Sequence, residues 1–280
     1  MSHTNTQNSN TPHYLYFLMI FLIAAMSQSL VVGVHETSHA LSCMLVGNSV
    51  LEYSALHVDC QPSDEASTST KFVAASGAIV NVIIGTIIYF VLGSGLNTSA
   101  NWKWFLWLLM FSNWSYGFGY LIFSGISGAG DYATVIAGWE PATLWQIGMI
   151  VLGAGLWLGS IFLALRLLGR IFGKMDDLKI SSLFHKLSIP SYLGAVSVIV
   201  CVASLNIHGI GGLPAIAGIM AAAGTLSPLF WMPFWFNSEQ FPKQGIVLKL
   251  DFDYRWLSVA VLISLVYVVL FGVGFTFPSI

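Results

Sequence analysis

The chain has 280 residues, of which 56% are hydrophobic and only 8% are charged, and its formal net charge is −2. Soluble globular proteins carry about 25% charged residues, so this composition excludes an ordinary soluble domain and favours an integral membrane protein. The chain offers no basic surface for phosphates, which excludes nucleic acid as a partner. We expect a multi-pass protein of the cell membrane, with the lipid bilayer around it.

Residues 1–12 are polar, contain no Lys or Arg, and are predicted to be a disordered tail. Apolar runs long enough to cross a bilayer then predict about seven spans. These are residues 14–46, 72–96, 104–123, 142–168, 191–205, 213–236 and 256–275. We therefore expect an all-α polytopic membrane protein, with a core at residues 13–137 and additional helices of the same membrane domain at 138–280.

The segments between the spans carry weaker signals. Residues 51–60 alternate loosely and predict a short strand after the first span, and residues 247–254 show a second strand pattern. Residues 170–186 are predicted to be a basic amphipathic connector. Cys43, Cys60 and Cys201 form no recognisable framework, and Cys43 and Cys201 are interpreted as small packing residues in apolar runs.

The first span contains an HExxH sequence, His35-Glu36-Thr37-Ser38-His39, and residues 14–34 before it contain no Lys, Arg, Asp or Glu. On a helix, His35 and His39 share a face. Two imidazoles at this spacing can hold one Zn²⁺, and Glu36 can take a proton from a metal-bound water. An accidental Glu would cost roughly 2.5–3.5 kcal/mol at the centre of a bilayer, which favours function over a structural polar cluster.

A catalytic zinc site needs a third protein ligand and an open position for water. The candidates are Asp131, Glu140, His57, Asp59, Cys60 and His208. Asp131 is favoured because the glycine-rich residues 125–130 before it allow irregular backbone near a site at membrane depth. Alternatively, Asp131 is a loop or N-cap carboxylate.

The other candidates have simpler interpretations. The cluster of His57, Asp59 and Cys60 is interpreted as a solvated loop, or else as a second metal site or part of a cleft entrance. Glu140 precedes Pro141 and the fourth span, where the start of a helix explains an acidic residue.

Three motifs carry a family resemblance. His35 to Leu41 followed by Gly47 resembles the first motif of the site-2 protease family of intramembrane zinc metalloproteases, with Ser38 in place of the usual Gly. Residues 75–81, Ala-Ser-Gly-Ala-Ile-Val-Asn, resemble the second motif, and residues 130–132, Gly-Asp-Tyr, the third. The order and spacing agree over residues 19–137. The usual Asn-Pro and Asp-Gly around the third ligand are absent, and no PDZ-like or nucleotide-sensing domain is visible.

The resemblance implies a Zn²⁺ cofactor bound by His35, His39 and Asp131, with Glu36 as the general base. It also implies that a peptide substrate adds as a strand to the element after the first motif helix.

The second motif supplies candidates for substrate binding. Asn81, with Gly77 in the same motif, is a candidate hydrogen-bond donor to the substrate backbone or the oxyanion, and Asn113 is a candidate of the same kind. An interhelical hydrogen bond is the alternative for Asn81.

The leading hypothesis is an intramembrane zinc endopeptidase that hydrolyses peptide bonds in or near the transmembrane segments of membrane-anchored proteins or leftover signal peptides. The alternatives are a non-proteolytic metal-binding membrane protein of the same fold and a divalent-metal transporter. The sequence gives no oligomeric state.

The distribution of basic residues and the family resemblance predict opposite orientations of the chain in the membrane. With seven spans, nine of the ten Lys and Arg residues fall on the same side as residue 13, and only Lys71 falls opposite. The positive-inside rule then directs the HExxH end of the first span outward, whereas site-2 proteases generally open their zinc site toward the cytoplasm. The two predicted orientations agree only if a span is miscounted, for example if the first run is two segments bent at residues 27–29. We favour such a miscount.

Overall fold

The computed structural model describes residues 12–61, 64, 67–172, 177–206, 209–235, 250 and 252–278. The helices are α1 (His13–Leu45), α2 (Thr68–Gly93), α3 (Ala100–Ser127), α4 (Asp131–Val135), α5 (Ala142–Phe172), α6 (Asp177–Leu205), α7 (Leu213–Thr225), α8 (Pro228–Trp235) and α9 (Tyr254–Val266), which a π-helical turn, Tyr267–Phe271, continues. The strands are β1 (Ser49–Tyr53), β2 (Val58–Gln61) and β3 (Phe275–Thr276). Residues 1–11 of the predicted tail lie outside the described residues, as do residues 247–249 and 251 of the predicted strand at 247–254. The described residues of that segment form no strand, and Tyr254 begins α9.

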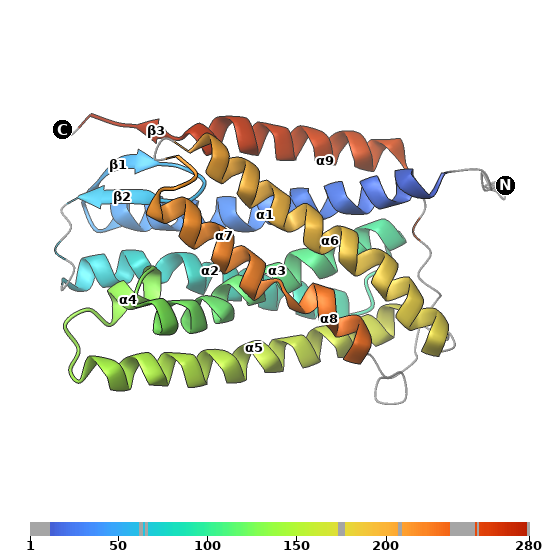
Figure 1. Ribbon diagram of the computed structural model, residues 1–280, viewed down its shortest axis with the longest axis horizontal. Coiled ribbons are helices and arrows are strands. Elements are labelled where there is room, and N and C mark those ends of the chain that lie inside the picture. Colours follow the sequence, from blue (N-terminus) through green and yellow to red (C-terminus); the bar gives the residue numbers. More distant parts are fainter. Residues whose placement is uncertain are drawn as a thin grey trace.

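Within the described residues, six segments are long and apolar enough to cross a membrane: α1, α2, α5, α6, the α7–α8 pair, and α9 with its π-helical turn. α3 has 28 residues and runs alongside them through the bundle (Figure 1). Large apolar side chains such as Leu45, Phe90 and Val151 are exposed on the outside, where lipid tails would surround them. The predicted class, an all-α polytopic membrane protein, is confirmed.

The helix boundaries correct three expectations. α1 is one continuous helix through residues 27–29, so the interpretation of the first run as two segments is wrong. α6 already begins at Asp177, within the predicted connector at 170–186. The predicted sixth span is two helices, because Pro228, which suits a first helical position, starts α8 after a turn at residues 226–227.

A small sheet caps one end of the bundle. β1 and β2 form an antiparallel hairpin, and β3 pairs with the other side of β1, so the order is β2-β1-β3. The single strand predicted at 51–60 is therefore two strands, because the chain reverses at Ser54, whose amide donates to the carbonyl of His57 at 2.9 Å. β2 is left at the edge of the sheet.

A disulfide joins Cys43, in the last turn of α1, to Cys60 in β2. The expectation of no framework, with Cys43 as a packing residue, is wrong. Cys201 is free, but it is exposed on α6 rather than packed inside. The disulfide fixes the edge strand β2 to the helix that carries the HExxH sequence.

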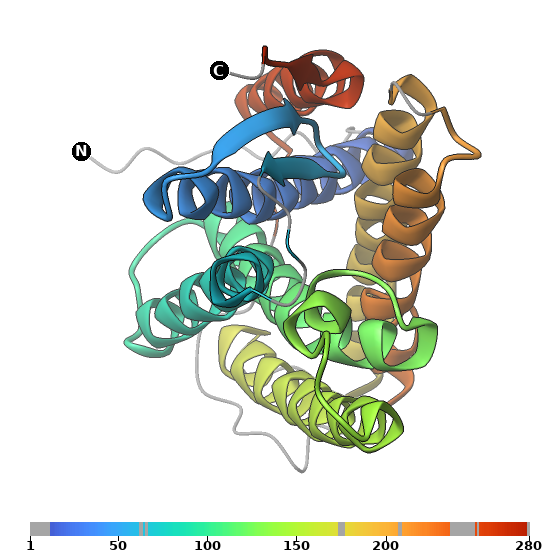
Figure 2. The same ribbon diagram turned by 90° about the vertical axis from the view of Figure 1, so that its left-hand side faces the viewer.

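The core surrounds α1, which packs against α2, α3, α6 and α9. Figure 2 views the bundle from the end where α1 terminates, and shows the hairpin, α4, α7 and the start of α2 gathered around this end. Gln28, Asn81 and Asn113 are buried between the helices. The interior is therefore partly polar while the outer surface is apolar, as expected for helices packed within lipid.

Candidate metal centre

α1 places His35 and His39 one turn apart on the same face, with their Nε2 atoms 3.1 Å from each other. Both imidazoles are buried. The hydroxyls of Thr37 and Ser38 donate to the carbonyls of Gly33 and Val34, four residues earlier. These bonds satisfy the polar side chains of the motif within the helix itself, so the helix continues through an apolar setting.

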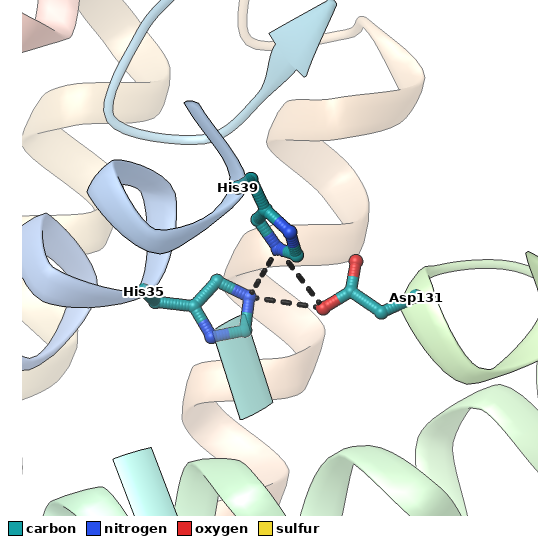
Figure 3. Close-up of side chains that lie close together, drawn as sticks. All are labelled: His35, His39 and Asp131. Carbon is teal, nitrogen blue, oxygen red and sulfur yellow. Dashed lines mark hydrogen bonds and ion pairs between the residues drawn. The ribbon is translucent and has the colours of Figure 1, made fainter. Parts of the chain in front are cut away.

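Asp131 is the first residue of α4, and the backbone before it is irregular. Gly128 and Gly130 both have a positive φ, 65° and 86°, which glycine adopts without steric cost. This turn brings Asp131 Oδ2 to 3.0 Å from His35 Nε2 and 3.3 Å from His39 Nε2. Figure 3 shows the three side chains pointing toward one another from α1 and α4. The structure thus brings together the three residues that the sequence predicts as metal ligands.

The chemistry of these groups fits a metal ion. His39 Nδ1 lies 2.7 Å from the carbonyl of Val73 and must donate to it, so a neutral His39 presents the lone pair of Nε2 to its neighbours. Among the described residues, the polar atoms that face Asp131 Oδ2 are the two Nε2 atoms, at 3.0 and 3.3 Å. Converging lone pairs repel one another unless a cation lies between them.

The spacing supports the same conclusion. Ligands of a tetrahedral Zn²⁺, at bond lengths of about 2.0–2.2 Å, lie about 3.3–3.6 Å apart, and the three atoms here are only slightly closer, 3.0–3.3 Å apart. Within the described residues, His35, His39 and Asp131 are the group of ligand-type side chains close enough to share an ion. The group can hold a metal, and imidazole together with carboxylate suits several divalent ions.

Glu36 shares a cavity of about 440 Å³ with the three residues. The cavity lies between α1, β2, α2, α3, α4, α6 and α7, and Tyr116 and Tyr120 line it from α3. The ring of Tyr120 lies 5.8 Å from that of His35. Neither tyrosine was predicted as a site residue from the sequence, although their four-residue spacing within an apolar run places them on one helix face.

α2 approaches α1 closely at the site because Gly77 has no side chain. A Cβ there would lie 2.6 Å from His39 Nε2 and 2.9 Å from two atoms of His35. Ser76 on α2 also hydrogen-bonds to Ser42 on α1 at 2.9 Å. Gly77 therefore has a packing role beside the imidazoles, and its part in substrate binding stays a prediction.

The two candidate asparagines lie away from the cavity. Asn81 is fully buried, and its amide has no hydrogen-bond partner among the described residues. Asn113 donates to the carbonyl of Leu109 at 2.7 Å. Neither lines the cavity that contains Glu36, so their roles in substrate binding stay predictions.

The other proposed ligands do not join the group. Glu140 is exposed and accepts a hydrogen bond from the amide of Ala142 at 3.3 Å, as expected at the start of a helix. Cys60 is held in the disulfide. His57 and Asp59 line the cavity without belonging to the group. His208 lies outside the described residues.

No family model, curated protein or solved structure matches this chain. Function is therefore inferred from the chain's own residues and their geometry, and the resemblance of its three motifs remains an expectation.

Proposed function

We propose that the protein is an intramembrane zinc endopeptidase that cuts membrane-anchored proteins or leftover signal peptides in or near their transmembrane segments. The observation that carries this proposal is the meeting of Asp131 with His35 and His39 in a cavity that also contains Glu36. A metal ligand set beside a buried carboxylate is the arrangement that metal-assisted hydrolysis requires.

His35, His39 and Asp131 would hold the Zn²⁺. When bound, the ion supplies a water of lowered pKa and a Lewis acid for the substrate carbonyl. Glu36 accepts a proton from the attacking water and passes it to the leaving amine. The carbonyl of Val73 fixes His39 with its proton on Nδ1, which keeps Nε2 free as a ligand atom.

The edge strand β2 is the proposed support for the substrate backbone. Val58, Asp59 and Cys60 line the cavity, and β2 pairs with β1 on one side only among the described strands. A peptide bond within a transmembrane helix is protected by the helical hydrogen bonds, so the substrate has to unwind. An unwound segment regains backbone hydrogen bonds by pairing with an edge strand.

The Glu36→Gln variant tests the proposal. Purified wild-type protein should contain one zinc per chain and cut a membrane-anchored model substrate. The variant should keep the zinc, because the three ligands are untouched, and its cleavage rate should fall by about 10²–10⁴-fold, the contribution of a positioned general base. The measurements are metal analysis of the purified protein and cleavage in vesicles.

The matched control is Glu140→Gln, the same chemical change at an exposed carboxylate outside the cavity, which should leave cleavage unchanged. Wild-type protein without bound zinc would contradict the proposal. Full cleavage by Glu36→Gln would contradict it too, and zinc without cleavage in the wild type would indicate a non-proteolytic metal-binding protein.

A further inference from the structure

The two ends of the bundle differ sharply in basic residues. The metal group lies at the end where α1 and α3 terminate and α2 and α5 begin (Figure 1). Among the residues that the structure describes, Lys71, near the start of α2, is the one basic residue at this end. Six of the other nine lie near helix termini at the opposite end: Lys103, Arg166, Arg170, Lys179, Lys186 and Arg255. The remaining three, Lys174, Lys243 and Lys249, lie outside the described residues. Basic residues are retained on the cytoplasmic side of membrane proteins.

Lys71 has a structural reason for its position. Its Nζ donates to the carbonyl of Ala137 at 2.6 Å and lies 5.2 Å from the ring centroid of Trp139. It thereby ties the start of α2 to the segment that follows α4. Lys71, the exception to the charge pattern, thus has a structural role at this end of the bundle.

The disulfide is a second and independent indication of sidedness. Cys43 and Cys60 are bonded at the same end as the metal group, and Cys60 also lines its cavity. Disulfides persist in oxidising compartments and are rare where cytosolic thiols keep cysteines reduced. The disulfide therefore assigns this end to the side of the membrane away from the cytosol, as the basic residues do.

Because α1 is continuous, the first run is a single crossing and gives no reason to reverse this orientation. A bend that split the first run into two crossings would reverse the direction of the HExxH end, but α1 is unbroken from His13 to Leu45. The two helices of the predicted sixth span, α7 and α8, follow each other along one crossing (Figure 1). The alternation of the helices therefore agrees with the charge pattern.

We infer that the cavity of His35, His39 and Asp131 opens to the extracytoplasmic side of the membrane, periplasmic, extracellular or lumenal. Resting on the proposed function, this makes the substrate class the extracytoplasmic juxtamembrane stretch of membrane-anchored proteins. The orientation is opposite to the one that the motif resemblance implies. It also exposes the disulfide-anchored strand β2 to peptides arriving from that side.

Cysteine labelling in right-side-out vesicles tests the orientation without using proteolysis. In a Cys201→Ser background, Thr143→Cys introduces a thiol at the exposed start of α5, and Asn97→Cys one in the exposed loop between α2 and α3. A membrane-impermeant maleimide should label the Thr143→Cys variant in sealed vesicles, and the Asn97→Cys variant only after permeabilisation. The reverse pattern, or labelling of both in sealed vesicles, overturns the inference.

The Cys201→Ser chain itself is the control. Cys43 and Cys60 should react with maleimide only after reduction, and two free thiols in native membranes would overturn the argument from the disulfide.

Two single-pass substrates that carry the same cleavable stretch outside or inside the membrane test the substrate class. Cleavage that depends on Glu36 should occur only in the outside version. Cleavage of the inside version alone overturns the inference. An outward labelling pattern with no cleavage of either substrate rejects the proposed function and leaves the orientation standing.

Discussion

Gly77 determines how closely α2 can approach the two imidazoles. The ring atoms of His35 and His39 fill the space where a Cβ would stand, at 2.9 and 2.6 Å. The imidazoles cannot retreat easily, because His39 is held by the carbonyl of Val73 and His35 by its place on the same helix. A methyl group at this position therefore has to move the helices apart or turn the rings away from Asp131.

We accordingly expect Gly77→Ala to weaken zinc binding by about 10–100-fold, the range seen when groups that orient metal ligands are lost. Competition with a chelator of known affinity measures the effect. Gly93→Ala is the matched control, because it lies on the same helix and a Cβ there meets nothing within 4 Å. Equal zinc affinity of the Gly77→Ala variant and the wild type would show that the site tolerates the added methyl.

At the residue scale, the sequence predicted what depends on spacing along one helix. His35 and His39 follow from helical periodicity, and Asp131 from the glycines before it, which allow the turn that the structure shows. The disulfide between Cys43 and Cys60 could not be predicted from local spacing, because it depends on the hairpin folding back against α1.

At the scale of elements, Lys71 connects α2 to the chain just after α4. Its bond to the carbonyl of Ala137 and its contact with Trp139 hold the segment whose first residue is Asp131. α4 has only five residues and none of them is buried, so it depends on such contacts for its position. The position of a ligand on this short, half-buried helix therefore depends on the contacts that anchor the helix.

Lys71→Met keeps the length of the side chain and removes the charged donor. A hydrogen bond to a charged group contributes about 1.5–3 kcal/mol, and the partial exposure of Lys71 lowers this figure. We expect faster hydrogen exchange in residues 128–138 and weaker zinc binding, both read by mass spectrometry. Lys103→Met, the same change at the opposite end of the bundle, should leave both unchanged. Unaltered exchange in Lys71→Met would mean that α4 is anchored by other contacts.

The elements that the sequence predicted are those with a strong local signal. Long apolar runs located the crossings, because only a helix satisfies its own backbone in lipid. The hairpin was predicted as one strand, since its turn at Ser54 contains neither Gly nor Pro. β3 has two residues and forms only by pairing with β1, so no local pattern could have indicated it.

At the scale of the whole molecule, the metal group joins parts of the chain that are distant in sequence. His35 and His39 lie on the central helix, and Asp131 lies on a short helix that follows α2 and α3. An ion held between them acts as a cross-link that exists only in the folded state. Its binding free energy therefore adds to the stability of the bundle.

Zinc should consequently raise the unfolding temperature of the purified protein, and a chelator should lower it. At free zinc one hundred times above Kd the gain is about 2.7 kcal/mol, which corresponds to roughly 5–10 °C for a chain of this size class. Asp131→Asn should lose most of this response, because the amide is a poorer ligand than the carboxylate. The Cys201→Ser chain should respond like the wild type. A thermal scan in detergent with and without zinc measures the shift, and an equal rise in Asp131→Asn would show that zinc stabilises the protein at another place.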